Sequence, residues 1–177
     1  GSISANAGVA PDGTTTADNW IPAASASSSH IFFRPMSDGN STLSIFAKPA
    51  GYDFINVIFQ VDAATSQGVQ FNISTGVIVT SQNATGTIID AGDGWYRCTV
   101  TPSNTTSSGY KVFNPNDGST PDTSNFFRSS FTGDGSSGVL CWGAQVETAA
   151  AVTGYLPTVA SSLSGLTTVT RGANGTT

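Results

Sequence analysis

The chain has 177 residues and a mass of 18.0 kDa, which fits one domain with a full core between two sheets. Charged residues make up 10% of the chain, against about 25% in an average soluble domain. The net charge is −5 and the six basic residues are scattered singly, which argues against nucleic-acid binding. No apolar run approaches the roughly 20 residues of a membrane-spanning helix. We therefore expect neither nucleic acid nor a membrane as partner.

Residues that favour helices are scarce, while β-branched residues and glycine are abundant. Short stretches with alternating or continuous apolar residues follow one another at intervals of roughly 8 to 12 residues, separated by turn residues. This spacing predicts an all-β sandwich or barrel. In chain order, the expected strands are residues 3–9, 20–21, 29–36, 42–48, 54–61, 69–73, 77–80, 86–90, 95–101 and 138–147.

The clearest of these strands covers residues 54–61. Its alternation places Ile55, Val57 and Phe59 toward the core, and Asn56 and Gln60 on the opposite side. The expected core residues from this and other strands are Val57, Phe59, Val100, Trp142 and Val146. Residues 102–137 are rich in Gly, Ser, Asn and Asp, and we expect them to form long loops.

The two cysteines fall at positions that disfavour a disulfide. Cys98 shares a strand face with Tyr96 and Val100, which we interpret as the inward face. Cys141 alternates with an apolar set that includes Leu140 and Trp142, which places its side chain on the other face. Because side chains on opposite faces cannot meet the geometry of a bridge, we favour free thiols over a disulfide.

Several motifs occur in a fixed order along the chain. They are Asn6–Asp18 (containing Ala-Pro-Asp-Gly-Thr), Thr42–Gly51, Phe71–Gly76, Asp93–Val100, Trp142-Gly-Ala-Gln-Val-Glu147, Tyr155-Leu-Pro-Thr158 and Thr170-Arg171. This series resembles a family of jelly-roll domains in phage virion proteins, namely head spikes, tail fibres and minor structural proteins. The resemblance implies a jelly-roll β-sandwich of two antiparallel sheets over residues 3–158, with residues 159–177 as a C-terminal extension or linker. Residues 103–137 have no counterpart in it.

The resemblance also implies a function. Such domains are similar in architecture to carbohydrate-binding modules, so we expect a non-enzymatic module on a virion surface or in another extracellular setting, with glycans as partners. One alternative is a carbohydrate-binding module cut from a polysaccharide-degrading enzyme. The other is a purely structural virion domain whose partners are other virion chains. Catalysis is not expected, since the single histidine, His30, lacks a Gly-x-Ser-x-Gly context and no carboxylate pair stands out.

Aromatic residues are the natural sugar contacts, because a flat ring stacks on the C–H face of a pyranose. The best candidates for exposed rings are Trp20, Tyr52 and Phe54, whereas Trp95 and Trp142 lie inside the motifs and are expected to be structural. Polar residues on the non-core side of strands form a second candidate set, although a solvated sheet face would have the same pattern. That set is His30, Arg34, Asn56 and Gln60.

Acidic residues near the motif turns raise a metal hypothesis. Asp12, Asp18 and Glu147 are candidate ligands for one calcium ion, and no other cofactor is expected. Glu147 is also a candidate partner for Arg97, with Asp90 as the alternative, in an ion pair between neighbouring strands.

Overall fold

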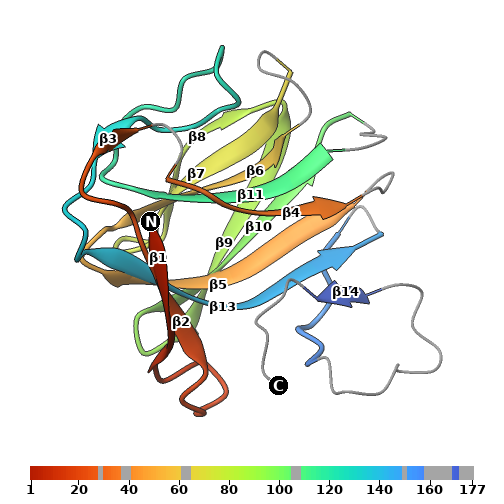
Figure 1. Ribbon diagram of the computed structural model, residues 1–177. Helices are drawn as coiled ribbons and strands as arrows, with labels where there is room; N and C mark the ends of the chain where they lie inside the picture. The colour runs from red at the N-terminus through yellow and green to blue at the C-terminus, as the bar shows by residue number, and fades with distance from the viewer. Residues whose placement is uncertain are drawn as a thin grey trace.

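The computed structural model describes residues 1–27, 30–36, 41–60, 65–104, 109–148, 151–157 and 169–171. Within this part the protein consists of strands and connecting turns, and all strand pairings between elements are antiparallel (Figure 1). The all-β prediction is therefore confirmed. Residue 29 of the expected strand 29–36, residue 61 of the expected strand 54–61 and most of the extension at 159–177 lie outside the described residues.

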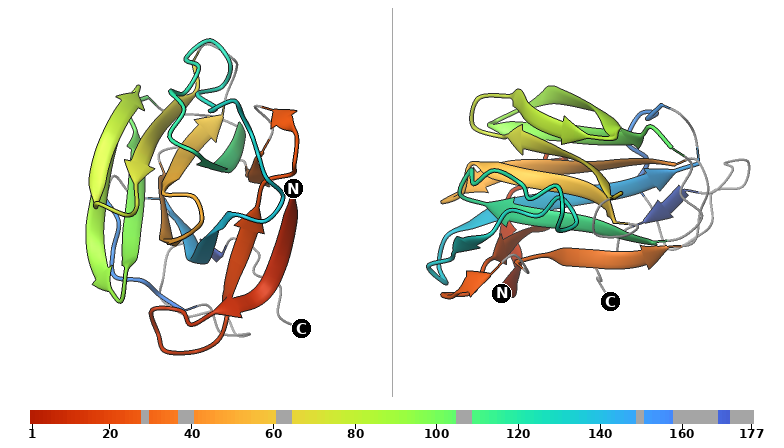
Figure 2. Two further views of the ribbon diagram at one scale, coloured as in Figure 1. Left: turned by 90° about the vertical axis from the view of Figure 1, so that its left-hand side faces the viewer. Right: turned by 90° about the horizontal axis from the view of Figure 1, so that it is seen from above.

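Two sheets face each other in a sandwich-like arrangement (Figures 1 and 2). The first sheet has the order β1-β2-β13-β5-β10-β9, and β14 pairs with β13. Its strands are β1 (Ser2–Gly8), β2 (Ala17–Ile21), β5 (Thr42–Ala50), β9 (Ala84–Gly92), β10 (Trp95–Pro102), β13 (Gly138–Glu147) and β14 (Val169–Arg171). Because β14 belongs to the predicted extension, part of that extension adds to the sheet.

The second sheet has the order β4-β11-β6-β7-β8. Its strands are β4 (Phe32–Met36), β6 (Phe54–Gln60), β7 (Gln67–Asn72), β8 (Val77–Gln82) and β11 (Gly109–Asn116). A small separate pair joins β3 (Ala26–Ser27) to β12 (Phe131–Thr132). The prediction of long loops over residues 102–137 was wrong for β11, which lies between β4 and β6 inside the sheet.

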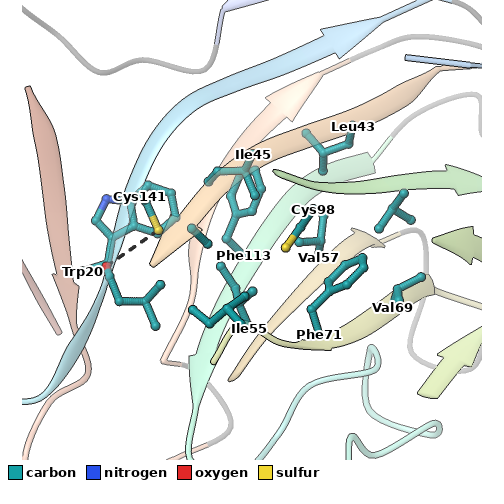
Figure 3. Close-up of a cluster of buried hydrophobic side chains, with 14 of the residues drawn as sticks. Trp20, Leu43, Ile45, Ile55, Val57, Val69, Phe71, Cys98, Phe113 and Cys141 are labelled. Carbon is teal, nitrogen blue, oxygen red and sulfur yellow. Dashed lines mark hydrogen bonds between the residues drawn. The ribbon is translucent and has the colours of Figure 1, made fainter. Parts of the chain in front are cut away.

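The main core lies between the two sheets (Figure 3). This core contains four of the five predicted core residues: Val57, Phe59, Val100 and Val146. The alternation predicted for β6 is also confirmed, because Ile55, Val57 and Phe59 all point inward. Burial of such side chains removes apolar surface from water and is the main force that holds the sheets together.

The fifth predicted core residue, Trp142, is buried in a second cluster on the outer side of the first sheet. It packs there with Phe46, Trp95 and Ala17. The reason is a β-bulge in β13: Trp142 pairs with Phe46 but Gln145 pairs with Ser44, so one extra residue intervenes. Gly143 lies in this bulge with a φ of 60°, a conformation that glycine adopts at little cost.

The bulge explains why the face predicted for Cys141 was wrong, and the distance between strands explains why the two thiols are free. Both thiols are free, as predicted, but the argument from opposite faces was wrong because Cys98 and Cys141 both point into the main core (Figure 3). They lie in β10 and β13, on either side of β5, with Cys98 opposite Ile45 and Cys141 opposite Ala47. Two strand spacings are about 9.5 Å, which exceeds the Cα separation of roughly 7 Å that a disulfide tolerates.

The buried thiols predict a loss of stability in alkaline solution. Burial raises the pKa of both, and the nearby Cys98 and Asp18 raise that of Cys141 further. The unfolded chain ionises its thiols at about pH 8.5, whereas the folded chain keeps them protonated. Stability present below that pH is therefore lost above it, by about 1.4 kcal/mol per pH unit for each thiol.

Urea unfolding between pH 7 and 10 measures this slope. The Cys98→Ala/Cys141→Ala double variant is the control, because its other titrating groups are unchanged. We expect its stability to fall less steeply with pH. Equal slopes for the two proteins would contradict thiol burial.

Candidate binding site at one end of the sandwich

One end of the sandwich carries the turn that connects the two sheets between β5 and β6 (Figure 2, left-hand view). Tyr52 is held in this turn by three contacts. Its backbone N–H donates to the Gly138 carbonyl at 3.1 Å. Its ring packs edge-on against Phe131, with 5.3 Å between ring centroids, and its hydroxyl accepts a hydrogen bond from the Asp134 N–H at 3.2 Å. Tyr52 is thus half-buried, in a fixed orientation, with part of its side chain in solvent.

Phe54 begins β6, where it pairs with Asn116 of β11 and Asn72 of β7. Its ring is half-buried because the turn after β11 packs against it. Gly118 lies in that turn with a φ of 95°, and a Cβ atom there would lie 2.8 Å from the Phe54 ring. The glycine therefore allows the backbone to approach the ring closely.

Acidic residues lie near Tyr52: Asp134 and Asp117 act on its hydroxyl, and Asp53 follows it in the chain. Asp53, Asp117 and Asp134 are exposed. The Ser137 hydroxyl and the N–H groups of Ser136 and Ser137 donate to Asp134, which holds the pKa of that carboxyl well below its usual range. The pKa of Tyr52 is raised, mainly by partial burial and further by the charges of Asp134 and Asp117, against the lowering effect of the Asp134 N–H.

We call Tyr52, Phe54, Gly118 and Asp134 the aromatic end. It offers partly exposed aromatic surface with carboxylates beside it. Aromatic surface stacks with the C–H face of a sugar, and carboxylates accept hydrogen bonds from hydroxyl groups. The arrangement is thus chemically suited to an uncharged polyhydroxylated ligand.

His30 is buried behind the aromatic end, where it packs against Phe131. Its side chain is 3% exposed, its Nε2 lies 2.9 Å from the Ser25 carbonyl oxygen, and its ring packs on Phe131 at 4.8 Å. The structure therefore brings the predicted residues His30 and Tyr52 together around Phe131, whereas Phe54 packs against the turn at Gly118. The sequence analysis missed Phe131 and Asp134, for which an Asp-Gly turn at residues 134–135 was the available signal.

Asn56 does not lie on an open sheet face, so the prediction of a polar binding face was wrong at this residue. The segment 117–131 crosses the outer side of the second sheet and buries Asn56 completely. Its Nδ2 donates to Asn114 Oδ1 and Ser129 Oγ, both at 3.1 Å, and its Oδ1 accepts from Asn116 Nδ2 at 3.1 Å. We call Asn56, Gln70, Asn114, Asn116 and Ser129 the amide network; it anchors the covering segment.

Gln60, a further member of the polar set, lies away from the aromatic end. Gln60 ends β6, six residues from Phe54, which is about 20 Å along a strand. It accepts a hydrogen bond from Arg128 of the covering segment. Arg34 lies in β4, where its backbone pairs with Lys111, and its side chain lies outside the described part of the chain.

Trp20 is 7% exposed, so the prediction that it offers an exposed ring was wrong. β2 lies between β1 and β13, which pairs Trp20 with Ile3 on one side and Val139 on the other. Its ring points into the main core, 5.5 Å from the Phe113 ring (Figure 3). Trp20 is therefore a core residue that closes the sandwich.

The three candidate calcium ligands lie apart. Asp12 caps a turn by accepting from the Thr14 N–H and hydroxyl, and Asp18 accepts from the Asn6 N–H. Asp18 pairs with Cys141 of β13, and Glu147 ends that strand six residues later, about 20 Å away. Within the described ranges, no three His, Cys, Asp or Glu side chains come together as a metal site.

Glu147 has a structural role at the C-terminal segment. It accepts hydrogen bonds from the Thr153 N–H, while Arg97 donates to the Thr153 carbonyl at 2.7 Å and to Ser44 Oγ at 3.0 Å. The expected Arg97–Glu147 pair is thus bridged by Thr153. Burial lowers the pKa of Arg97, and the charge of Glu147 partly opposes this effect.

The described part of the chain contains no helix that is long and apolar enough to cross a membrane. Comparison of the chain with protein-family models and with curated proteins found no match in either case.

Proposed function

We propose that this protein is a non-enzymatic jelly-roll module of a phage virion surface and that it binds neutral glycans through the aromatic end. The single observation that carries the binding role is the fixed, half-exposed Tyr52, which lies two residues before Phe54 and accepts a hydrogen bond from the Asp134 N–H. A rigid aromatic side chain contributes contact area at little cost in conformational entropy.

The order of strand pairing supports the jelly-roll assignment. A jelly roll is a long antiparallel hairpin of eight strands rolled into two sheets, so the first strand pairs with the eighth and the second with the seventh. Here β2 pairs with β13, β4 with β11, β5 with β10 and β6 with β7. Of the other long strands, β1 adds to the edge of the first sheet beside β2, and β8 and β9 are an insertion between β7 and β10. The virion setting rests on the motif series alone.

The charges around the site favour neutral ligands. Asp53, Asp117 and Asp134 would repel sulfate and uronate groups, and the net charge of −5 has the same sign. Contacts made by a ring and by hydrogen bonds depend little on ionic strength. We therefore expect neutral glycans to bind better than sulfated or uronate-rich ones, with little dependence on salt.

The Tyr52→Ala variant tests the site. We expect it to weaken binding of a neutral glycan, chosen from a glycan array, by about 1–3 kcal/mol, a typical loss for an aromatic contact residue. Isothermal titration calorimetry measures the change. Tyr110→Ala is the matched control, because Tyr110 is 43% exposed and is the second residue of β11, at the other end of the strand from Asn116.

Equal losses in the two variants would contradict a site at Tyr52. An array without any bound glycan, together with a defined contact to another virion chain, would favour the purely structural role. The exposed edge strand β8 is the observation that favours that second role.

A further inference from the structure

The side of the sandwich formed by β8 and β9 is an open edge of both sheets. β8 is the last strand of the second sheet and β9 the last strand of the first, and no described strand pairs with the other side of either one. The two strands lie next to each other, and Figure 2 shows both in yellow-green on one side of the molecule. An open edge presents backbone N–H and C=O groups that can pair with a further strand.

This edge is apolar at its surface. Val77, Ile78 and Val79 of β8 are 52%, 39% and 49% exposed, and Ile89 of β9 is 57% exposed. Three consecutive exposed β-branched residues are unusual on the surface of a strand, where polar residues normally alternate with buried ones. Such residues also have high β propensity and favour cross-strand pairing.

The β8 edge has little of the usual protection against strand addition. Soluble proteins protect exposed edges with charged side chains, proline, bulges or covering segments. β8 has one bulge, at Val79, but it contains neither charge nor proline. The uncharged stretch extends from Ala63 to Ile89, within a chain whose net charge is −5. β8 therefore has no charge with which to select an oppositely charged partner or to repel its own copy, and Asp90 near the end of β9 is the one charged residue of the two edge strands.

We propose that this edge binds a second copy of the same chain through antiparallel pairing of β8 with β8. The occupant must be an uncharged strand with its own free edge and apolar side chains. Another copy of β8 has all of these properties, and a two-fold axis lets both copies use the same surface. The exposed apolar strip is small compared with a standard stable interface. The dimer is therefore weak and forms at high local concentration.

Sedimentation velocity tests the proposal on the full chain, from about 10 μM to about 1 mM, where small interfaces associate. We expect a dimer that increases with concentration, and a dissociation constant at least about tenfold higher for Val77→Lys, because the lysine places a charge on the apolar strip that pairing would bury. Ile3→Lys is the matched control, since Ile3 is an apolar residue, 55% exposed, on β1 at the opposite edge of the first sheet. Its dissociation constant should equal that of the wild type.

A cross-linking series provides a readout that does not depend on how the lysine variant folds. Cys98 and Cys141 are buried, so a cysteine placed at residue 77, 78 or 79 is the reactive thiol. We expect at least one of Val77→Cys, Ile78→Cys and Val79→Cys to form a disulfide-linked dimer under copper phenanthroline faster than Ile3→Cys. A monomer at every concentration, an equal effect of both lysine variants, or equal cross-linking of all four cysteine variants would each overturn the proposal. Tyr52→Ala should leave the dimer unchanged, which separates this result from glycan binding.

Discussion

We expect the Trp142→Ala variant to lose about 3–5 kcal/mol of unfolding free energy, the range for removal of a large buried aromatic side chain. Trp142 is 8% exposed; its ring lies 5.4 Å from that of Phe46 and 4.6 Å from that of Tyr155. Its indole N–H also donates to Thr16 Oγ1 at 3.0 Å. The substitution would therefore open a cavity and release both the turn before β2 and the C-terminal segment.

Urea unfolding measures this loss. Ile89→Ala is the control, because Ile89 is exposed and its change should stay within about 0.5 kcal/mol. A loss below about 1 kcal/mol for Trp142→Ala would show that the C-terminal segment does not bury the ring. Trp142 would then become a surface aromatic and a further candidate for sugar contact.

The second large effect is expected for Asn56→Ala, which should lower the unfolding free energy by about 3 kcal/mol or more. The substitution removes partners from Asn114, Asn116 and Ser129 at once. Each buried polar group left without a hydrogen bond costs about 1–3 kcal/mol. The alanine also leaves a cavity in the space of the removed amide group.

Two measurements check the amide network. Thermal unfolding gives the stability change. Relative to the wild type, hydrogen exchange in Asn56→Ala should become faster in the covering segment 117–131, and more so there than in β5. Thr87→Ala, at an exposed position of β9, is the control and should change neither. A loss near that of the control would mean that segment 117–131 does not depend on the network.

The sequence predicted the fold where periodicity alone decides it. In β6 the alternation of Ile55, Val57 and Phe59 with Asn56 gives the inward face directly. It does not show that Asn56 is buried, because the covering segment is more than 60 residues further along the chain. β11 was missed for a related reason: its buried polar residues, Asn114 and Asn116, look like loop residues until their amide partners are known.

Two further errors have local causes. The inward face of β13 changes at the bulge, so strict alternation placed Cys141 on the wrong side and Trp142 in the wrong cluster. Trp20 follows a polar stretch and precedes Pro22, which resembles an exposed turn. Its burial depends on pairing with β13, about 120 residues away, and short-range patterns do not contain that information.

The most direct test of the proposed function is an NMR titration of the ¹⁵N-labelled chain with a neutral glycan selected by array. A binding site at the aromatic end predicts that the largest amide shift changes occur at Tyr52, Phe54, Gly118 and Asp134, which lie at one end of the sandwich. The amides of β8 and of the covered residues Asn56 and Asn114 should change little. Largest shifts on β8, β9 or the outer side of the first sheet, with the aromatic end unchanged, would contradict the account.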